Sequence, residues 1–325
     1  MSEPLLEVKD LVKHFTLNGD LVSRIAGKTQ TVKAVDGVSF YIHQGETLGL
    51  VGESGCGKST TGRLITRLIE PTAGDINLRG EDMLAFTLKR MRETRKDVQL
   101  VFQDPYSSLN PRKTIMDILS RPLEVHNLAD NWHEKRERVL ELLNLVGMGS
   151  EHIDRYPHEF SGGQRQRIAI ARALSVTPDL VIGDEPVSAL DVSIQAQILN
   201  LLRELQEKFS LTYLFIAHDL AVIRHISDRV AVMYVGKIVE SGPVETIFNE
   251  PLHPYTKALL AAVPEADPKK PPPRLTLKGE VATPIDPPPG CRLNGRCPLA
   301  TSICGEVEPP LLEVATNHQV ACHNL

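Results

Sequence analysis

The sequence has no apolar run close to the roughly 20 residues that a membrane-spanning helix needs. Its opening stretch, MSEPLLEVKDLV, also lacks the charged-then-apolar pattern of a secretory signal. Basic residues are not in excess either, since 36 Lys and Arg face 41 Asp and Glu and the net charge is -5. These absences exclude a channel built from this chain alone, argue against a nucleic-acid partner and predict a cytosolic location.

Cysteine is nearly absent from most of the chain. Cys56 stands alone before residue 290, and four others follow in the spacing C-x5-C-x6-C-x17-C: Cys291, Cys297, Cys304 and Cys322. Stable disulfides are not expected in a cytosolic protein, so four thiolates together suggest a metal. The C-x2-C pairs of zinc knuckles are missing, which makes a four-cysteine [4Fe–4S] cluster at least as reasonable as zinc. Zinc with His318 or His323 as a substitute ligand, and unliganded cysteines, are the alternatives.

Hydrophobic periodicity predicts an α/β core. Alternating apolar positions predict strands over 5–15 and 32–48, with a polar loop, LNGDLVSRIAGKTQ, between them. Helical periodicity over 114–150 predicts a helical insertion. The runs DLVIGDEP and LTYLFIAHD end in charged residues, as parallel strands do when their carboxyl ends face a ligand. Two strand-like runs around Gly236 predict a hairpin.

The composition changes after Pro264, where PEADPKKPPP and IDPPPG form proline-rich connectors that cannot be helix interiors. We therefore predict one large domain over residues 1–263, with its helical part at about 105–158. A proline-rich linker and a cysteine-containing tail module follow over residues 264–325.

The stretch GESGCGKST has the pattern of a phosphate-binding loop. Its spacing G-x-x-x-x-G-K-S turns backbone N–H groups toward phosphate oxygens, while Lys58 reaches the terminal phosphates and Ser59 offers a hydroxyl to Mg²⁺. A strand-like run precedes it and a helical run follows, which places the phosphate at a helix N-terminus. The candidate nucleotide-binding residues are Gly52, Ser54, Gly55, Cys56, Gly57, Lys58, Ser59 and Thr60.

Polar residues after other apolar runs fit a nucleotide hydrolase. Asp184 and Glu185 end the run LVIGD, so that one carboxylate can support Mg²⁺ and the next can polarise a water for attack on the γ-phosphate. Gln103 follows LVF and can sense Mg²⁺ or the attacking water, and His218 follows LFIA and can contact the γ-phosphate. Taken singly, each is better explained as an ordinary polar residue at a strand end.

The stretch FSGGQRQRIAIARAL adds a second predicted anion site. Ser161, Gly162 and Gly163 precede a strongly helical run whose N-terminus exposes backbone donors. A serine N-cap with glycines before an amphipathic helix explains the helix start equally well, but it does not explain the phosphate loop and the acidic pair in the same chain.

Six motifs in one order resemble the nucleotide-binding subunits of ABC transporters. They are Walker A at 52–59, the Gln loop at Gln103, the signature FSGGQ, Walker B ending in GDE, the D-loop SALD at 188–191, and the switch residue His218. The resemblance implies a P-loop NTPase (RecA-like) α/β core with an N-terminal antiparallel β-subdomain and an inserted α-helical subdomain. A small cysteine-containing tail module completes the expected architecture.

The same resemblance implies that two such domains sandwich two ATP molecules head to tail. Lys58 and Ser59 would bind phosphate and Mg²⁺, with Gln103 and Asp184 supporting the metal. Glu185 would be the catalytic base, assisted by Gln103 and His218. Phe15 matches the aromatic residue that stacks on adenine, although a strand phenylalanine is more often a core residue. The residues that would clamp the nucleotide of the opposing chain are Ser161, Gly162, Gly163 and Gln164.

The stretch HPYTKALL at 253–260, joined to the cysteine tail, resembles the oligopeptide and dipeptide importer branch, whose ATPase subunits carry a C-terminal [4Fe–4S] cluster. The long insertion after Phe15 is more similar to the F-type subunit of that branch than to its D-type paralogue. The resemblance implies a bacterial peptide importer at the cytoplasmic face of the inner membrane. Its other components would be a D-type ATPase, two transmembrane permease subunits and, indirectly, an extracytoplasmic binding protein.

Other functions are compatible with parts of this pattern. The imported ligand of such a system can also be glutathione, haem or a nickel complex. A soluble ABC ATPase acting on nucleic acid or ribosomes typically has long coiled coils or two ATPase domains, and neither is evident. A nucleotide-binding scaffold without turnover is disfavoured by the intact Glu185.

Overall fold

The computed structural model describes residues 3–17, 30–262, 277–279 and 282–325. The chain divides into two compact units, which are described separately. Unit 1 comprises residues 1–42, 47–84 and 217–325, and unit 2 comprises residues 43–46 and 85–216. Most of the predicted loop LNGDLVSRIAGKTQ and all of the connector PEADPKKPPP lie outside the described residues. None of the described helices combines the length and apolar character that a bilayer crossing requires.

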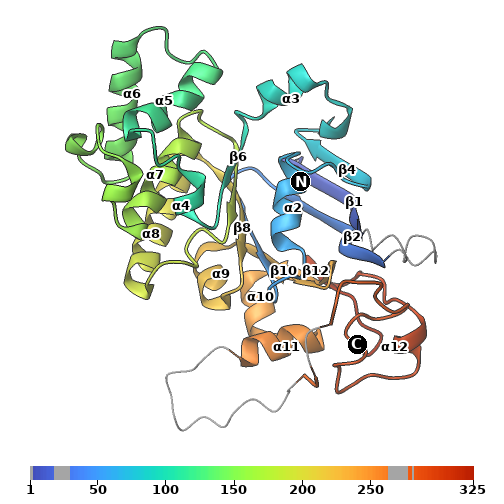
Figure 1. The fold of residues 1–325 in the computed structure, drawn as a ribbon. Coiled ribbons are helices and arrows are strands. Elements are labelled where there is room, and N and C mark those ends of the chain that lie inside the picture. The colour runs from blue at the N-terminus through green and yellow to red at the C-terminus, as the bar shows by residue number, and fades with distance from the viewer. Residues whose placement is uncertain (1–2, 18–29, 263–276, 280–281) are drawn as a thin grey trace. The chain divides into compact units, whose positions relative to one another are not determined.

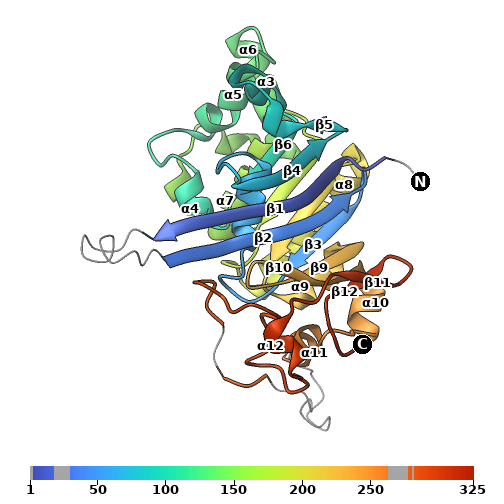
Figure 2. The same cartoon turned by 90° about the vertical axis from the view of Figure 1, so that its right-hand side faces the viewer.

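An antiparallel sheet with the strand order β2-β1-β4-β5 opens unit 1, and Figure 2 shows β1 running between β2 and β4. Its strands are β1 (Leu6–Leu17), β2 (Gln30–Ile42), β4 (Ala73–Leu78) and β5 (Glu81–Asp82). The buried side chains of Leu6, Val8 and Leu11 on β1 supply the apolar face that the sequence pattern predicts. The expected N-terminal antiparallel β-subdomain is therefore confirmed.

A second group of strands in unit 1 has the order β11-β12-β10-β9-β3. The strands are β3 (Thr47–Val51), β9 (Arg229–Tyr234), β10 (Lys237–Pro243), β11 (Leu312–Ala315) and β12 (His318–Val320). β3 is fully buried and parallel to β9, whereas β9 and β10 form the predicted hairpin. Its turn residues Val235 and Gly236 both have positive φ, at 41° and 81°, which suits a two-residue hairpin turn.

Two sequence predictions for unit 1 need correction. The strand predicted over 32–48 is two strands, β2 and β3, separated by a turn in which Gly45 has a φ of 76°. Both halves are apolar, so periodicity alone does not locate the break. β11 and β12 in the tail were not predicted, because they are short and all four residues of β11 are exposed.

The helices of unit 1 lie between and after these strands. They are α2 (Lys58–Ile65), α9 (Leu220–Ile226), α10 (Val244–Asn249), α11 (Pro254–Ala261) and α12 (Ile303–Glu306). A short 3-10 helix, η1 (Met83–Ala85), ends the unit's central segment. α9 lies close to β3, because a Cβ placed on Gly49 would be 2.6 Å from the Ser227 Oγ and 2.9 Å from the Ile223 Cγ2.

Unit 2 contains three parallel strands in the order β8-β7-β6, with helices around them (Figure 1). The strands are β6 (Val98–Val101), β7 (Leu180–Asp184) and β8 (Thr212–Ala217). Every residue of β7 and β8 is buried, as expected for parallel strands covered on both faces.

The helices of unit 2 include the predicted helical insertion, which lies between β6 and the signature helix α7. They are α3 (Leu88–Thr94), α4 (Pro105–Ser108), α5 (Ile115–Val125), α6 (Trp132–Leu145), α7 (Gly162–Leu174) and α8 (Val192–Phe209). Two 3-10 helices, η2 (Ser150–His152) and η3 (Pro157–Glu159), connect the insertion to α7.

Candidate active site

The loop at 52–60 in unit 1 is held tightly by neighbouring backbone. A Cβ on Gly52 would lie 2.1 Å from the carbonyl oxygen of Met233, and a Cβ on Gly57 would lie 2.1 Å from that of Ala34. Gly57 also has a φ of 111°, which L side chains rarely adopt. Both motif glycines are therefore required by the approach of β2 and β9, independently of any bound phosphate.

Lys58 begins α2 and closes over its own loop. Its side chain is 4% exposed, and its Nζ donates to the carbonyl oxygens of Gly52 at 2.8 Å and Glu53 at 3.1 Å. Its N-cap, Gly57, provides no side-chain cap for the helix N-terminus. A phosphate that met this ammonium would replace carbonyl oxygens with a stronger, charged acceptor. Burial raises the pKa of the neighbouring Cys56 thiol, which is a packed residue of the loop.

Three contacts that the sequence did not reveal hold the loop from outside. The Glu53 N–H donates to the Tyr255 hydroxyl at 2.8 Å. The Glu53 carboxylate accepts from both Nη atoms of Arg296, at 2.8 and 3.2 Å. The Gly236 N–H donates to the Cys56 carbonyl oxygen at 2.8 Å. The sequence signal for Tyr255 was its place in HPYTKALL, and Arg296 directly precedes a tail cysteine.

The acidic pair lies at the end of β7 in unit 2. Asp184 is 2% exposed, and the next residue, Glu185, has a φ of 49°, a left-handed backbone that costs energy outside glycine and is common at active sites. The Glu185 N–H donates to the Ile216 carbonyl oxygen at 3.0 Å, which fixes this backbone against β8. The Glu185 Oε2 accepts from the Gln103 Nε2 at 3.2 Å. The structure thus brings the predicted catalytic residues Gln103 and Glu185 together.

The signature residues begin helix α7 in unit 2. Ser161 is its N-cap and forms a capping box with Gln164, in which the Gln164 N–H donates to the Ser161 Oγ at 3.3 Å and the Ser161 N–H donates to the Gln164 Oε1 at 3.0 Å. A Cβ on Gly163 would lie 2.5 Å from the Ile194 Cγ2, and one on Gly162 would lie 3.3 Å from the Leu190 Cδ2. Capping and packing against the D-loop and α8 therefore account for part of this motif, and its role toward an opposing nucleotide stays a prediction.

Two other predicted residues belong to unit 1. Phe15 is 37% exposed near the end of β1, with the Lys13 Nζ 5.1 Å from its ring centre, so it is not a core residue. His218 is an exposed residue that directly follows β8. Their predicted contacts with adenine and the γ-phosphate stay predictions.

The four tail cysteines are close enough to influence one another. Burial raises the pKa of the Cys291 thiol to about 11, and the nearby thiols of Cys304, Cys322 and Cys297 add to that increase. Across the residues that the structure describes, however, no three histidine, cysteine or carboxylate side chains converge tightly enough for one metal ion. The Nε2 of His318 is bonded to the Glu240 carboxylate, and that of His323 to a backbone carbonyl, which disfavours either as a substitute ligand.

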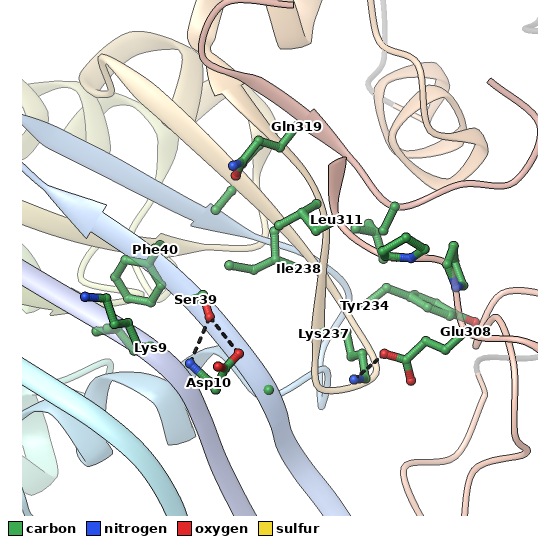
Figure 3. A pocket seen from close by; sticks show the side chains of 18 of the residues that line it. Lys9, Asp10, Ser39, Phe40, Tyr234, Lys237, Ile238, Glu308, Leu311 and Gln319 are labelled. Atoms are coloured by element: carbon green, nitrogen blue, oxygen red, sulfur yellow. Dashed lines mark hydrogen bonds and ion pairs between the residues drawn. The ribbon is translucent and has the colours of Figure 1, made fainter. Parts of the chain in front are cut away.

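Unit 1 also contains a cavity of about 470 Å³ between the β1–β2 sheet and the tail (Figure 3). Its walls include Ser39 and Phe40 on β2, Ile238 on β10, and Leu311 and Gln319 of the tail. None of the described residues 52–60 lines it, so this cavity is separate from the phosphate loop.

Comparisons with known proteins match both parts of the chain. A family model described as "ABC transporter" matches residues 35–188, and one described as "Oligopeptide/dipeptide transporter, C-terminal region" matches residues 239–304. The "Oligopeptide transport ATP-binding protein AppF" of Bacillus subtilis (strain 168) is 53% identical over 99% of this chain and 97% of its own length. The "Dipeptide transport ATP-binding protein DppF" of Escherichia coli (strain K12) is 48% identical over 99% of this chain and 95% of its own length.

Solved structures are similar as well. One is titled "Dimeric structure of a post-hydrolysis state of the ATP-binding cassette MJ0796 bound to ADP and Pi". It has a TM-score of 0.65 and 28% sequence identity, and the match covers 74% of this chain and 98% of that one.

Proposed function

This chain belongs to the ABC transporter family of ATP-binding, ATP-hydrolysing proteins, and on that premise we propose that it is the ATPase subunit of a bacterial importer for dipeptides or oligopeptides. The observation that carries the substrate class is the match of residues 239–304 to the oligopeptide/dipeptide transporter region. That region lies outside the segment matched by the ABC transporter family model, so it adds information beyond ATP hydrolysis. The names of the two relatives above support the same substrate class.

The residues of the site divide the chemistry of hydrolysis. Lys58 would exchange its loop carbonyls for the phosphates of ATP. The hydroxyl, amide and carboxylate oxygens of Ser59, Gln103 and Asp184 are the hard donors that Mg²⁺ prefers, so this donor set fits the ion. When bound, Mg²⁺ neutralises charge on the phosphates. Glu185 would polarise the attacking water, with its carboxylate oriented by the Gln103 amide.

Assembly with other chains is part of the proposal. The dimeric cassette of the solved structure supports a head-to-tail arrangement in which Ser161, Gly162, Gly163 and Gln164 face the nucleotide of an opposing ATPase. We assign that opposing position to a D-type paralogue. Two permease subunits would receive the motion at the cytoplasmic face of the membrane, and an extracytoplasmic binding protein would deliver the substrate.

The tail cysteines fit a [4Fe–4S] cluster better than a single zinc ion. With Zn–S bonds of about 2.3 Å, four sulfurs on one zinc lie within about 4 Å of each other, and no such compact group is present in the described residues. A cluster binds each thiolate through a different iron, which suits thiols that are near but not in contact. We propose Cys291, Cys297, Cys304 and Cys322 as its ligands.

Transport in a reconstituted system tests the proposed function. The chain is assembled in proteoliposomes with the permeases and the second ATPase encoded beside it, and a labelled dipeptide or oligopeptide is supplied with the binding protein. We expect ATP-dependent uptake that stops when Glu185 is replaced by Gln. Uptake of glutathione, haem or a nickel complex without peptide uptake would reassign the substrate. ATP hydrolysis that ignores the permeases would reject the transport role.

A further inference from the structure

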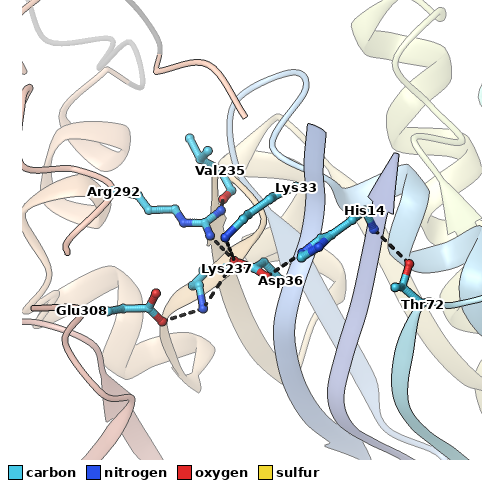
Figure 4. A network of polar contacts seen from close by, with 8 residues as sticks. All are labelled: His14, Lys33, Asp36, Thr72, Val235, Lys237, Arg292 and Glu308. Carbon is cyan, nitrogen blue, oxygen red and sulfur yellow. Dashed lines mark hydrogen bonds and ion pairs between the residues drawn. The ribbon is translucent and has the colours of Figure 1, made fainter. Parts of the chain in front are cut away.

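Two arginines next to tail cysteines connect the tail to the rest of unit 1. Arg292 follows Cys291 and Arg296 precedes Cys297. Arg292 pairs with the Asp36 carboxylate of β2 and donates to the Val235 carbonyl oxygen (Figure 4). Arg296 instead reaches Glu53, inside the phosphate loop. The tail is therefore connected to the loop itself.

The Arg296–Glu53 contact has the geometry of a strong ion pair. Both Nη atoms of Arg296 donate to the two carboxylate oxygens, at 2.8 and 3.2 Å, in a bidentate arrangement. The Arg296 side chain is only 12% exposed and that of Glu53 25%. The guanidinium also lies over the Tyr234 ring, 5.8 Å from its centre, and the hydrogen bonds to Glu53 raise the pKa of Arg296. Such a pair restrains its partners more than an exposed one does.

Glu53 is held from three directions. Its carboxylate meets Arg296, its N–H meets the Tyr255 hydroxyl of α11, and its carbonyl oxygen accepts from the Lys58 ammonium. The far side of the loop is fixed in a related way. Arg292 binds the carbonyl of Val235, and the N–H of the next residue, Gly236, binds the Cys56 carbonyl.

We propose that Arg296 is a positioning residue through which the cysteine tail sets the nucleotide affinity of the loop at 52–60. The proposal rests on ATP binding at this loop. Two physical effects support it. The guanidinium neutralises a carboxylate that would otherwise repel the incoming phosphates at short range. It also fixes the loop before the nucleotide arrives, which lowers the entropy cost of binding.

Binding of a fluorescent ATP analogue to the full chain tests the proposal. Replacing Arg296 by Met should raise the Kd about 10-fold, equivalent to about 1.4 kcal/mol. In a Glu53→Gln background the same replacement should change the Kd less than about 2-fold, because the carboxylate that it leaves unpaired is gone. In the assembled transporter, Arg296→Met should raise the KM for ATP and leave kcat unchanged, since Arg296 touches no reacting group.

Glu308→Gln is the matched control. Glu308 is a half-exposed tail residue that pairs with Lys237 on β10, away from the loop, so its loss should loosen the tail without changing the Kd. If Arg296→Met speeds proteolysis of the tail but leaves the Kd unchanged, the arginine is only a structural contact and the proposal is wrong. Equal effects of Arg296→Met in both backgrounds would also overturn it. If Arg296→Met does not fold, Arg296→Lys is tested in the same two backgrounds, with an expected change of about 3-fold in one and none in the other.

Failure of the proposed function has a different signature. A wild-type chain without saturable nucleotide binding, or a Lys58→Ala variant that binds as well as wild type, would contradict ATP binding at this loop. Normal wild-type binding that is insensitive to Arg296 would contradict only the role of the tail.

Discussion

The packing of Gly163 against Ile194 gives a prediction that separates packing from nucleotide binding. A Cβ at Gly163 would lie 2.5 Å from the Ile194 Cγ2, well inside ordinary van der Waals contact. Overpacking of this kind costs about 1–3 kcal/mol. Alanine returns up to about 1 kcal/mol, because it is a better helix former than glycine. The balance for Gly163→Ala is a net destabilisation of about 1 kcal/mol.

The same variant should behave oppositely once the obstructing atom is removed. In an Ile194→Ala background the Cγ2 is absent, so Gly163→Ala should become neutral or stabilising by up to about 1 kcal/mol. Gly162→Ala is the control, since its nearest neighbour is the Leu190 Cδ2 at 3.3 Å, the far end of a flexible side chain. It should change stability by less than about 0.5 kcal/mol.

Urea unfolding measures these differences. The single tryptophan of the chain, Trp132, lies on α6, so its fluorescence reports on unit 2, which contains both Gly163 and Ile194. A Gly163→Ala variant that is equally destabilised with and without the isoleucine side chain would refute the steric reasoning. ATP hydrolysis by the stable double variant then reports whether Gly163 also serves the opposing nucleotide.

Three further predictions concern catalysis, the tail and acid stability. Glu185→Gln should retain ATP binding and lose hydrolysis by about 10²-fold or more in the assembled complex, and near-normal hydrolysis would reject its role. Cys297→Ser should remove iron and acid-labile sulfide from protein purified without air while Cys56→Ser retains both, and zinc in the wild type would replace the cluster assignment. Burial tends to raise the pKa of Asp36, but its hydrogen bond to His14 and the cations around it outweigh burial and lower that pKa below 3.8. Its stabilising contribution should be complete above pH 3.8 and disappear as the pH falls below that value, so the difference in urea midpoint between wild type and Asp36→Asn should shrink there.

The fold was largely predictable because its signals are local. The runs at β7 and β8 are continuously apolar and bounded by charged residues, which is typical of parallel strands. The hairpin turn at Gly236 and the helix start at Ser161 also depend on neighbouring residues. Gln103 and Glu185 were predicted from motif order, and the structure places them in hydrogen-bond contact.

The contacts that hold the phosphate loop were not predictable, because they join distant positions. Glu53 and Tyr255 are 202 positions apart, and Glu53 and Arg296 are 243 apart. No periodicity links residues at such separations, and a basic residue beside a cysteine has many possible partners. The sequence consequently predicted the tail as a separate module and gave no indication of its connection to the loop.

The pairing of β12 with β10 has a consequence for solubility. Without β12, one side of β10 would present unpaired N–H and C=O groups, an open sheet edge on which strands of other molecules can add. The native sheet ends instead at β11, a four-residue strand whose side chains are all exposed and include Glu313. A short, charged outer strand of this kind discourages intermolecular pairing. Constructs truncated before residue 312 would therefore expose a surface prone to aggregation, whatever their ATPase activity.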